Sequence, residues 1–160
     1  MRFFWIAMII AILTTGCEDN RIYEQYTDFE EGYWLVSNKP EFEFVINDSN
    51  TRYNLYSNVR NAVSYPWSRL FMTYYLQDSI GNVVHKSLTN DYLFEAKSGK
   101  PLGTSGLGDI YDHRLLLLKN YQFQKPGKYK IRFEQFMRTD TLQGILAVGL
   151  RVEKSVPAAN

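Results

Sequence analysis

Apolar and polar residues alternate in short segments along most of this chain, and this pattern constrains the fold more than any other feature. In Glu41–Ile46 (EFEFVI), Phe42, Phe44 and Ile46 fall on one face and the two glutamates on the other. That arrangement is typical of a half-buried β-strand. The same pattern recurs in residues 53–60, 70–77, 109–118, 129–133 and 146–152. No segment has a convincing amphipathic-helix pattern, so we expect an all-β fold.

Turn signals separate these segments and set the architecture. Asp78–Asn82 (DSIGN) predicts a hairpin, with Val83 beginning the returning strand, and Pro126-Gly127 predicts another turn. About eight short strands of this kind pack naturally as a two-sheet antiparallel β-sandwich of jelly-roll or Greek-key type. Within it we expect Leu115–Leu118 to be buried on both faces. Arg21–Phe29 is the one stretch whose spacing also allows a helical turn.

The first 16 residues have the pattern of an export signal, and they are followed by Cys17, the only cysteine of the chain. Arg2 is followed by an unbroken apolar run, Phe3–Leu13, and Thr14, Thr15 and Gly16 are small. The run is shorter than the ~20 residues that a membrane-spanning helix needs, but it fits the apolar region of a signal peptide. Bacterial lipoprotein processing attaches a diacylglycerol to such a cysteine, cuts before it and acylates the new amino terminus. We therefore predict lipidation of Cys17, whose acyl chains would hold the mature protein to a membrane.

Two alternatives to lipidation stay open. A signal peptide cut elsewhere would leave a free thiol, and a signal-anchor helix would need more apolar residues. The usual lipobox also has leucine three residues before the cysteine, where this chain has Thr14.

The chain divides into four predicted parts. Residues 1–16 form the signal peptide, 17–30 a lipid-anchored tether, 31–154 the β-sandwich domain and 155–160 a flexible tail. The domain is long enough to bury a core without a disulfide or a metal. With Cys17 acylated, no disulfide is possible within the mature chain.

Charge and composition narrow the class of partner. The chain has 18 basic and 17 acidic residues, with no run of like charge in the mature region. Nucleic-acid binders usually carry a basic patch, so we expect no nucleic-acid partner. Aromatic residues make up 16% of the chain, which suits β-sandwich strands and also surfaces that bind sugars or proteins.

No set of residues predicts catalysis. Only His85 and His113 are available, and a metal site built from Asp109, Asp112 and His113 would lack the usual number of converging ligands. The glycines of Gly103–Gly108 match neither the dinucleotide nor the P-loop spacing, and no serine lies in a nucleophile elbow. We therefore expect a protein that is not an enzyme, with no cofactor or metal.

Two features allow a binding role. Trp34, Tyr65 and Trp67 are candidates for stacking on sugar rings if they are exposed. The glycine-rich segment Ala96–Gly108 is longer than an ordinary hairpin connection, and such segments often have a function. We favour the simpler interpretation, a crossover between the two sheets.

Several segments, taken in their order and spacing, resemble the gliding-motility lipoprotein GldH family. The resemblance covers Cys17–Lys154. The segments that carry it are Tyr53–Tyr56, Arg60-Asn61, Tyr65-Pro66, Leu70-Phe71, Gly106–Asp112, Phe123–Tyr129, Glu134–Arg138 and Val148–Lys154.

The resemblance implies a lipoprotein of the cell envelope that is needed for gliding over surfaces. Several proteins of that machinery are linked to type IX secretion, and relatives occur in species that do not glide. Cys17 is the only family residue that carries over to this chain. The implied partners are the membrane, through lipid on Cys17, and other envelope proteins of the machinery.

Two functions are therefore considered. The leading one is a lipid-anchored, non-enzymatic gliding component acting by protein–protein contacts in a Gram-negative envelope, at the outer membrane, on its periplasmic or its surface side. The alternative is a surface lipoprotein that binds glycans; no other small-molecule ligand is expected.

Overall fold

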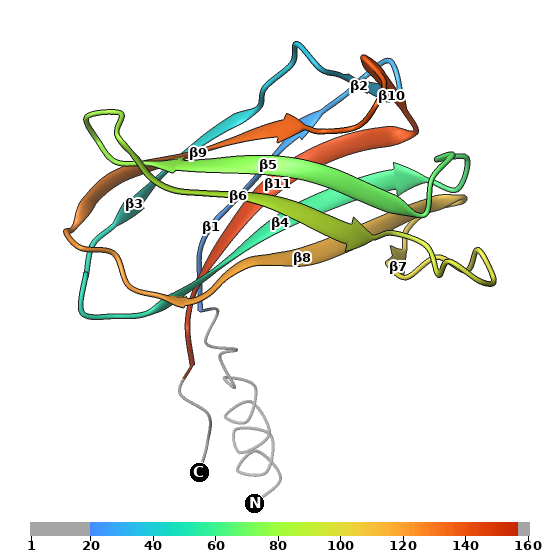
Figure 1. The fold of residues 1–160 in the computed structure, drawn as a ribbon. Helices are drawn as coiled ribbons and strands as arrows, with labels where there is room; N and C mark the ends of the chain where they lie inside the picture. Colours follow the sequence, from blue (N-terminus) through green and yellow to red (C-terminus); the bar gives the residue numbers. More distant parts are fainter. Residues whose placement is uncertain (1–19, 157–160) are drawn as a thin grey trace, which may run out of the picture.

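A computed structural model describes residues 20–156 as two packed antiparallel sheets (Figure 1). The predicted all-β sandwich is confirmed. The strands are β1 (Arg21–Asp28), β2 (Tyr33–Leu35), β3 (Glu41–Ile46), β4 (Tyr53–Ala62), β5 (Arg69–Gln77), β6 (Val83–Tyr92), β7 (Thr104–Ser105), β8 (Ile110–Tyr121), β9 (Gly127–Gln135), β10 (Thr141–Gln143) and β11 (Ile145–Lys154). Residues 20–156 contain no helix of the length and apolarity needed to cross a bilayer.

The strand order is that of a jelly roll. One sheet has the order β1-β11-β4-β8-β7, the other β3-β9-β5-β6, and β10 and β2 form a small separate ribbon. If the short β2, β7 and β10 are set aside, the chain changes sheet after nearly every strand, apart from the β5–β6 hairpin. This is the double-sheet arrangement expected for eight long strands.

The core lies between the inner faces of the two sheets. In β3 the exposure alternates as the sequence predicts, with Phe42, Phe44 and Ile46 buried and the residues between them exposed. Rings from the two sheets meet there, such as Tyr23 of β1 and Phe44 of β3, whose centroids are 5.9 Å apart. Burial of these faces is the main force that joins the two sheets.

The paired strands β2 and β10 lie at one end of the sandwich (Figure 1), and Trp34 of β2 belongs to the core there. Trp34 is fully buried and stacks on Phe29 with 5.5 Å between the ring centroids. Its indole Nε1 donates a hydrogen bond of 2.7 Å to the carbonyl oxygen of Asn38. The ring therefore fills the core with its polar atom satisfied.

Three local expectations are tested by the structure. The helical turn over Arg21–Phe29 is wrong, because Arg21–Asp28 pairs with β11 as an edge strand and is part of the sheet, not of a tether. Burial of Leu115–Leu118 on both faces is also wrong, since Leu116 is 48% exposed. Ala96–Gly108 does cross between the sheets: it follows β6 of one sheet and includes β7 of the other.

Candidate functional site

Cys17, the predicted lipidation site, lies outside the described residues, but the structure describes the strand that begins shortly after it. β1 begins at Arg21 and pairs with β11 along its whole length, from Arg21 opposite Glu153 to Asp28 opposite Ala147. A chain spans at most ~3.5 Å per residue, so Arg21 lies within roughly 14 Å of Cys17. Any anchor on Cys17 is therefore attached closely to the five-stranded sheet.

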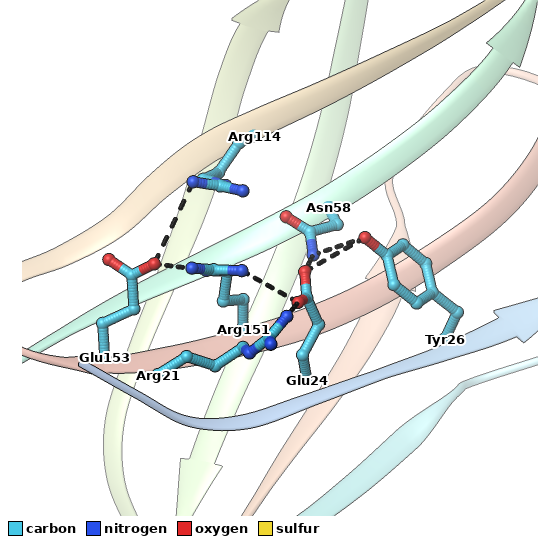
Figure 2. A network of polar contacts seen from close by, with 7 residues as sticks. All are labelled: Arg21, Glu24, Tyr26, Asn58, Arg114, Arg151 and Glu153. Carbon is cyan, nitrogen blue, oxygen red and sulfur yellow. Dashed lines mark hydrogen bonds and ion pairs between the residues drawn. The ribbon is translucent and has the colours of Figure 1, made fainter. Parts of the chain in front are cut away.

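Glu24 is the centre of a polar network that joins β1 to its neighbours on the outer face of this sheet (Figure 2). Its Oε2 accepts hydrogen bonds from Arg151 Nη1 at 2.8 Å and from Arg21 Nη1 at 2.7 Å. Its Oε1 accepts one of 2.8 Å from Asn58 Nδ2 and one of 3.2 Å from the Tyr26 hydroxyl. The network thus links the edge strand to β11 and β4.

Arg151 extends the network to β8. Its Nε also pairs with Glu153, and Arg114 of β8 lies 3.9 Å from the same carboxylate. The side chains of Arg151 and Glu24 are only 14% and 16% exposed. Charged groups this well shielded from water are costly to leave unpaired, so each holds the others in place.

Gly149 makes room for the Tyr26 ring in this network. The two residues are opposite each other in the β1–β11 pairing. A Cβ at position 149 would lie 2.6 Å from the carbonyl oxygen of Gln25 and 2.8 Å from Tyr26 Cδ1. Only glycine allows the edge strand to approach this closely.

We expect the network to make the stability of the folded protein depend on pH in the acid range. Burial raises the pKa of Glu24. Hydrogen bonds from Arg21, Asn58 and Tyr26 and the charge of Arg151 together lower the pKa by more than burial raises it, so the pKa lies below its ordinary value of 4.5. The unfolded chain then binds this proton more readily, so the stabilisation is complete above about pH 4.5 and is lost as the pH falls through the lower folded pKa. Urea unfolding at pH 7 and pH 4 should show a smaller loss of stability in Glu24→Gln than in the wild type.

Glu31→Gln is the matched control for that prediction. Glu31 is exposed in the turn after β1 and takes no part in the network. An equal change in acid sensitivity in both variants would contradict the assignment to Glu24.

The candidate metal ligands Asp109, Asp112 and His113 do not come together. His113 points between the sheets, where its Nε2 lies 2.8 Å from Asn61 Oδ1, whereas Asp112 points outward to Arg60 Nε at 2.9 Å. Successive residues of a strand face opposite sides, so these two side chains cannot bind one ion. Residues 20–156 contain no group of three or more potential ligands.

His113 should instead make stability sensitive to mild acid. Burial lowers its pKa below 6.5, and the nearby charge of Asp112 opposes this only in part. The unfolded chain gains the proton first, so stability should fall as the pH drops from 6.5 toward the folded pKa. Unfolding midpoints between pH 7.5 and 5.5 should show this slope, and His113→Gln should reduce it. If His85→Gln reduces it as much, the assignment is wrong.

The three proposed sugar-stacking residues do not form an aromatic platform. Trp34 is fully buried and Tyr65 is 5% exposed, whereas Trp67 is 41% exposed. The Tyr65 and Trp67 rings meet edge to face at 5.6 Å, so the pair offers no common flat surface. The prediction that these three residues together form a sugar-binding platform is therefore wrong.

A different surface emerges from the structure, formed by five side chains from three separate segments. We call it the apolar surface; its members are Trp67, Phe71, Leu88, Phe136 and Met137. Together with Arg138 they line a groove of about 680 Å³ on the outer side of the four-stranded sheet. Its members lie too far apart in the sequence for any spacing to predict the surface.

Comparison with known proteins gives consistent results over nearly the whole chain. Residues 21–152 match the model of the GldH lipoprotein family. The chain is 32% identical over 158 residues to the gliding motility lipoprotein GldH homolog of Christiangramia forsetii, covering 94% of both proteins. It is 28% identical over 156 residues to gliding motility lipoprotein GldH of Flavobacterium johnsoniae, covering 93% of this chain and 94% of that protein.

Among solved structures, the similarity is weaker. The structure of infectious bursal disease virus Gx strain matches with a TM-score of 0.40 and 13% identity, over 82% of this chain and 29% of that chain. A score of this size carries no argument about function.

Proposed function

This chain belongs to the GldH lipoprotein family, and from that membership we propose that it is a lipid-anchored, non-enzymatic component of the gliding-motility machinery. In this role it acts through contacts with other proteins of the cell envelope. The proposal includes removal of residues 1–16, lipidation of Cys17, an outer-membrane location and a link to type IX secretion. The observation that carries it is the family match over residues 21–152, supported by two relatives whose names include gliding motility.

The arrangement of β1 fits this role. A lipoprotein anchored at Cys17 transmits any load on its partners through the first strand of its domain. Here that strand pairs with β11 over seven residue pairs and is further joined to the sheet through Glu24. Strand pairing and charge-assisted hydrogen bonds together resist the peeling of an edge strand.

Crosslinking in intact cells tests the proposed protein contacts. The protein is tagged at its C-terminus, crosslinked and purified, and the co-purifying proteins are identified by mass spectrometry. We expect motility or secretion proteins of the envelope, recovered less with Cys17→Ala, which lacks the anchor. Recovery of polysaccharide without any protein partner would contradict the proposal.

A further inference from the structure

We propose that the apolar surface and the neighbouring edge of β6 bind an extended, acidic segment of a partner protein, which adds to the sheet as a further strand. This rests on the proposed function in one respect, namely that the protein acts through protein contacts. It adds the surface that is used and the chemistry of the segment that binds there.

The edge of β6 is open to an added strand. β6 is last in the order β3-β9-β5-β6, and within residues 20–156 it pairs with β5 alone. It is ten residues long, contains no proline, and exposes Val83, Val84 and Leu88 by 44–50%. An edge of this length and apolarity is a template for strand addition, in which backbone hydrogen bonds supply affinity.

The apolar surface lies directly beside this edge. Leu88 is opposite Thr73 in the β5–β6 pairing, and Phe71 is two residues further along β5 on the same outer face. The backbone N–H of Phe136 donates a 2.9 Å hydrogen bond to the carbonyl oxygen of Phe71, which holds the 64% exposed Phe136 ring at the groove. Alternate side chains of an added strand would reach this groove and bury it.

The charges around the surface favour an acidic segment. At the opposite edge of the same sheet, between β3 and β9, cations are paired, with Lys128 3.0 Å from Glu43 and Lys130 2.9 Å from Glu41. Beside the apolar surface, Arg69 packs on the Tyr92 ring at 4.1 Å.

Two further cations lie beside the apolar surface. Lys86 packs on the Tyr75 ring at 4.8 Å, and Arg138 lines the groove. Among residues 20–156, no carboxylate lies within 4.0 Å of the charged nitrogens of Arg69, Lys86 or Arg138. Carboxylates on the incoming segment would complement these three cations. A second copy of this chain would bring the same cations together across a two-fold interface, so it fits less well.

One end of the apolar surface, at Trp67, is distant from the start of β1. β1 begins beside Glu153, and β4 begins beside Lys154, at the end of the sheet where the described chain begins. Trp67 follows the opposite end of β4, and a strand of ten residues is about 33 Å long. A segment paired with β6 would therefore extend from this distant end, beside Tyr92, along the edge toward Val83.

Site-specific photocrosslinking in cells that produce the full chain tests this proposal. A benzophenone amino acid is placed at position 84 or 88 of β6, and at Val45 as the control. Val45 is 48% exposed on β3, the other edge of the same sheet, and Leu88 is 50% exposed. We expect positions 84 and 88 to capture one protein, at sites about four residues apart in a single Asp- or Glu-containing segment, because strand pairing keeps the two chains in register. Position 45 should not capture that protein.

A charge introduced on the surface should remove the contact. Leu88→Glu places a carboxylate on the groove and should lower capture from position 84 by about tenfold or more, whereas Val45→Glu should leave it unchanged. Thermal unfolding of both variants establishes that they remain folded.

Four results would overturn the proposal: no capture from positions 84 and 88, equal capture of the same protein from position 45, sites scattered over a partner, or capture of a second copy of this chain. If one of these is found and a deletion strain still fails to glide, the proposed function stands and only the surface is wrong. If the deletion strain glides normally, the proposed function fails independently of the crosslinks.

Discussion

Replacing Trp34 by alanine should lower the free energy of unfolding by about 3–5 kcal/mol, the range for truncating a fully buried large aromatic residue. The indole is completely shielded from solvent, stacks on Phe29 and donates its N–H to the Asn38 carbonyl. Truncation leaves a cavity between the β2–β10 ribbon and the sandwich, and it removes the hydrogen-bond donor to the carbonyl oxygen of Asn38, which follows β2. Urea unfolding followed by tryptophan fluorescence and by circular dichroism measures the loss.

Trp67→Ala is the matched control, since the same side chain is removed from a position that is 41% exposed. We expect a clearly smaller loss there, of about 1–2 kcal/mol, because two fifths of this residue is already exposed to water in the folded state and less apolar area is lost from the core. Equal losses in the two variants would contradict the assignment of Trp34 to the core. They would also mean that Trp34 is exposed and is again a candidate for stacking on sugar rings.

Replacing Cys17 by alanine should move the protein almost completely from the membrane fraction to the soluble fraction of the envelope. Stable anchoring requires two lipid signals, and lipoprotein processing provides both through this one residue. The measurement is fractionation of cells followed by immunoblotting. The intact mass of the wild type should show the acyl groups on residue 17.

If the signal peptide of the Cys17→Ala variant stays uncleaved, its apolar segment would hold the protein at the membrane without lipid, and a second variant separates these two cases. In it, residues 1–17 are replaced by a signal peptide that the ordinary signal peptidase removes, so that neither lipid nor apolar segment remains. Membrane association of this variant would mean that protein partners, and not lipid, hold the domain in place.

The strands could be predicted largely from sequence because half-buried strands alternate with period two. The prediction for Glu41–Ile46 coincides with β3, and the hairpin at Asp78–Asn82 joins β5 and β6. Alternation shows which residues face the core, but it does not show which strands are neighbours. The order of the strands therefore required the structure.

β1 was missed for a physical reason. Ile22, Tyr26 and Phe29 are spaced like one face of a helix, yet Ile22 and Tyr26 are 37% and 43% exposed on an edge strand. Pairing with β11 and the contacts of Glu24 outweigh this weak local pattern. Tertiary interactions of this kind leave no local signal in the sequence.

The sites show the same limit. Cys17 was predicted because signal peptides are read locally along the chain. In contrast, Glu24 and Arg151 are 127 residues apart, and Phe71, Leu88 and Phe136 come from three separate segments. Only folding brings such side chains together, so neither the network nor the apolar surface could have been predicted from spacing.

The most direct test of the central claim is the gliding of a deletion strain, scored as cell movement over a surface and complemented in parallel with the wild type and with Cys17→Ala. The proposed role predicts that the deletion strain stops gliding, that the wild type restores movement, and that the variant without the lipid restores little or none. A deletion strain that glides and secretes as well as its parent would contradict a role in the gliding machinery.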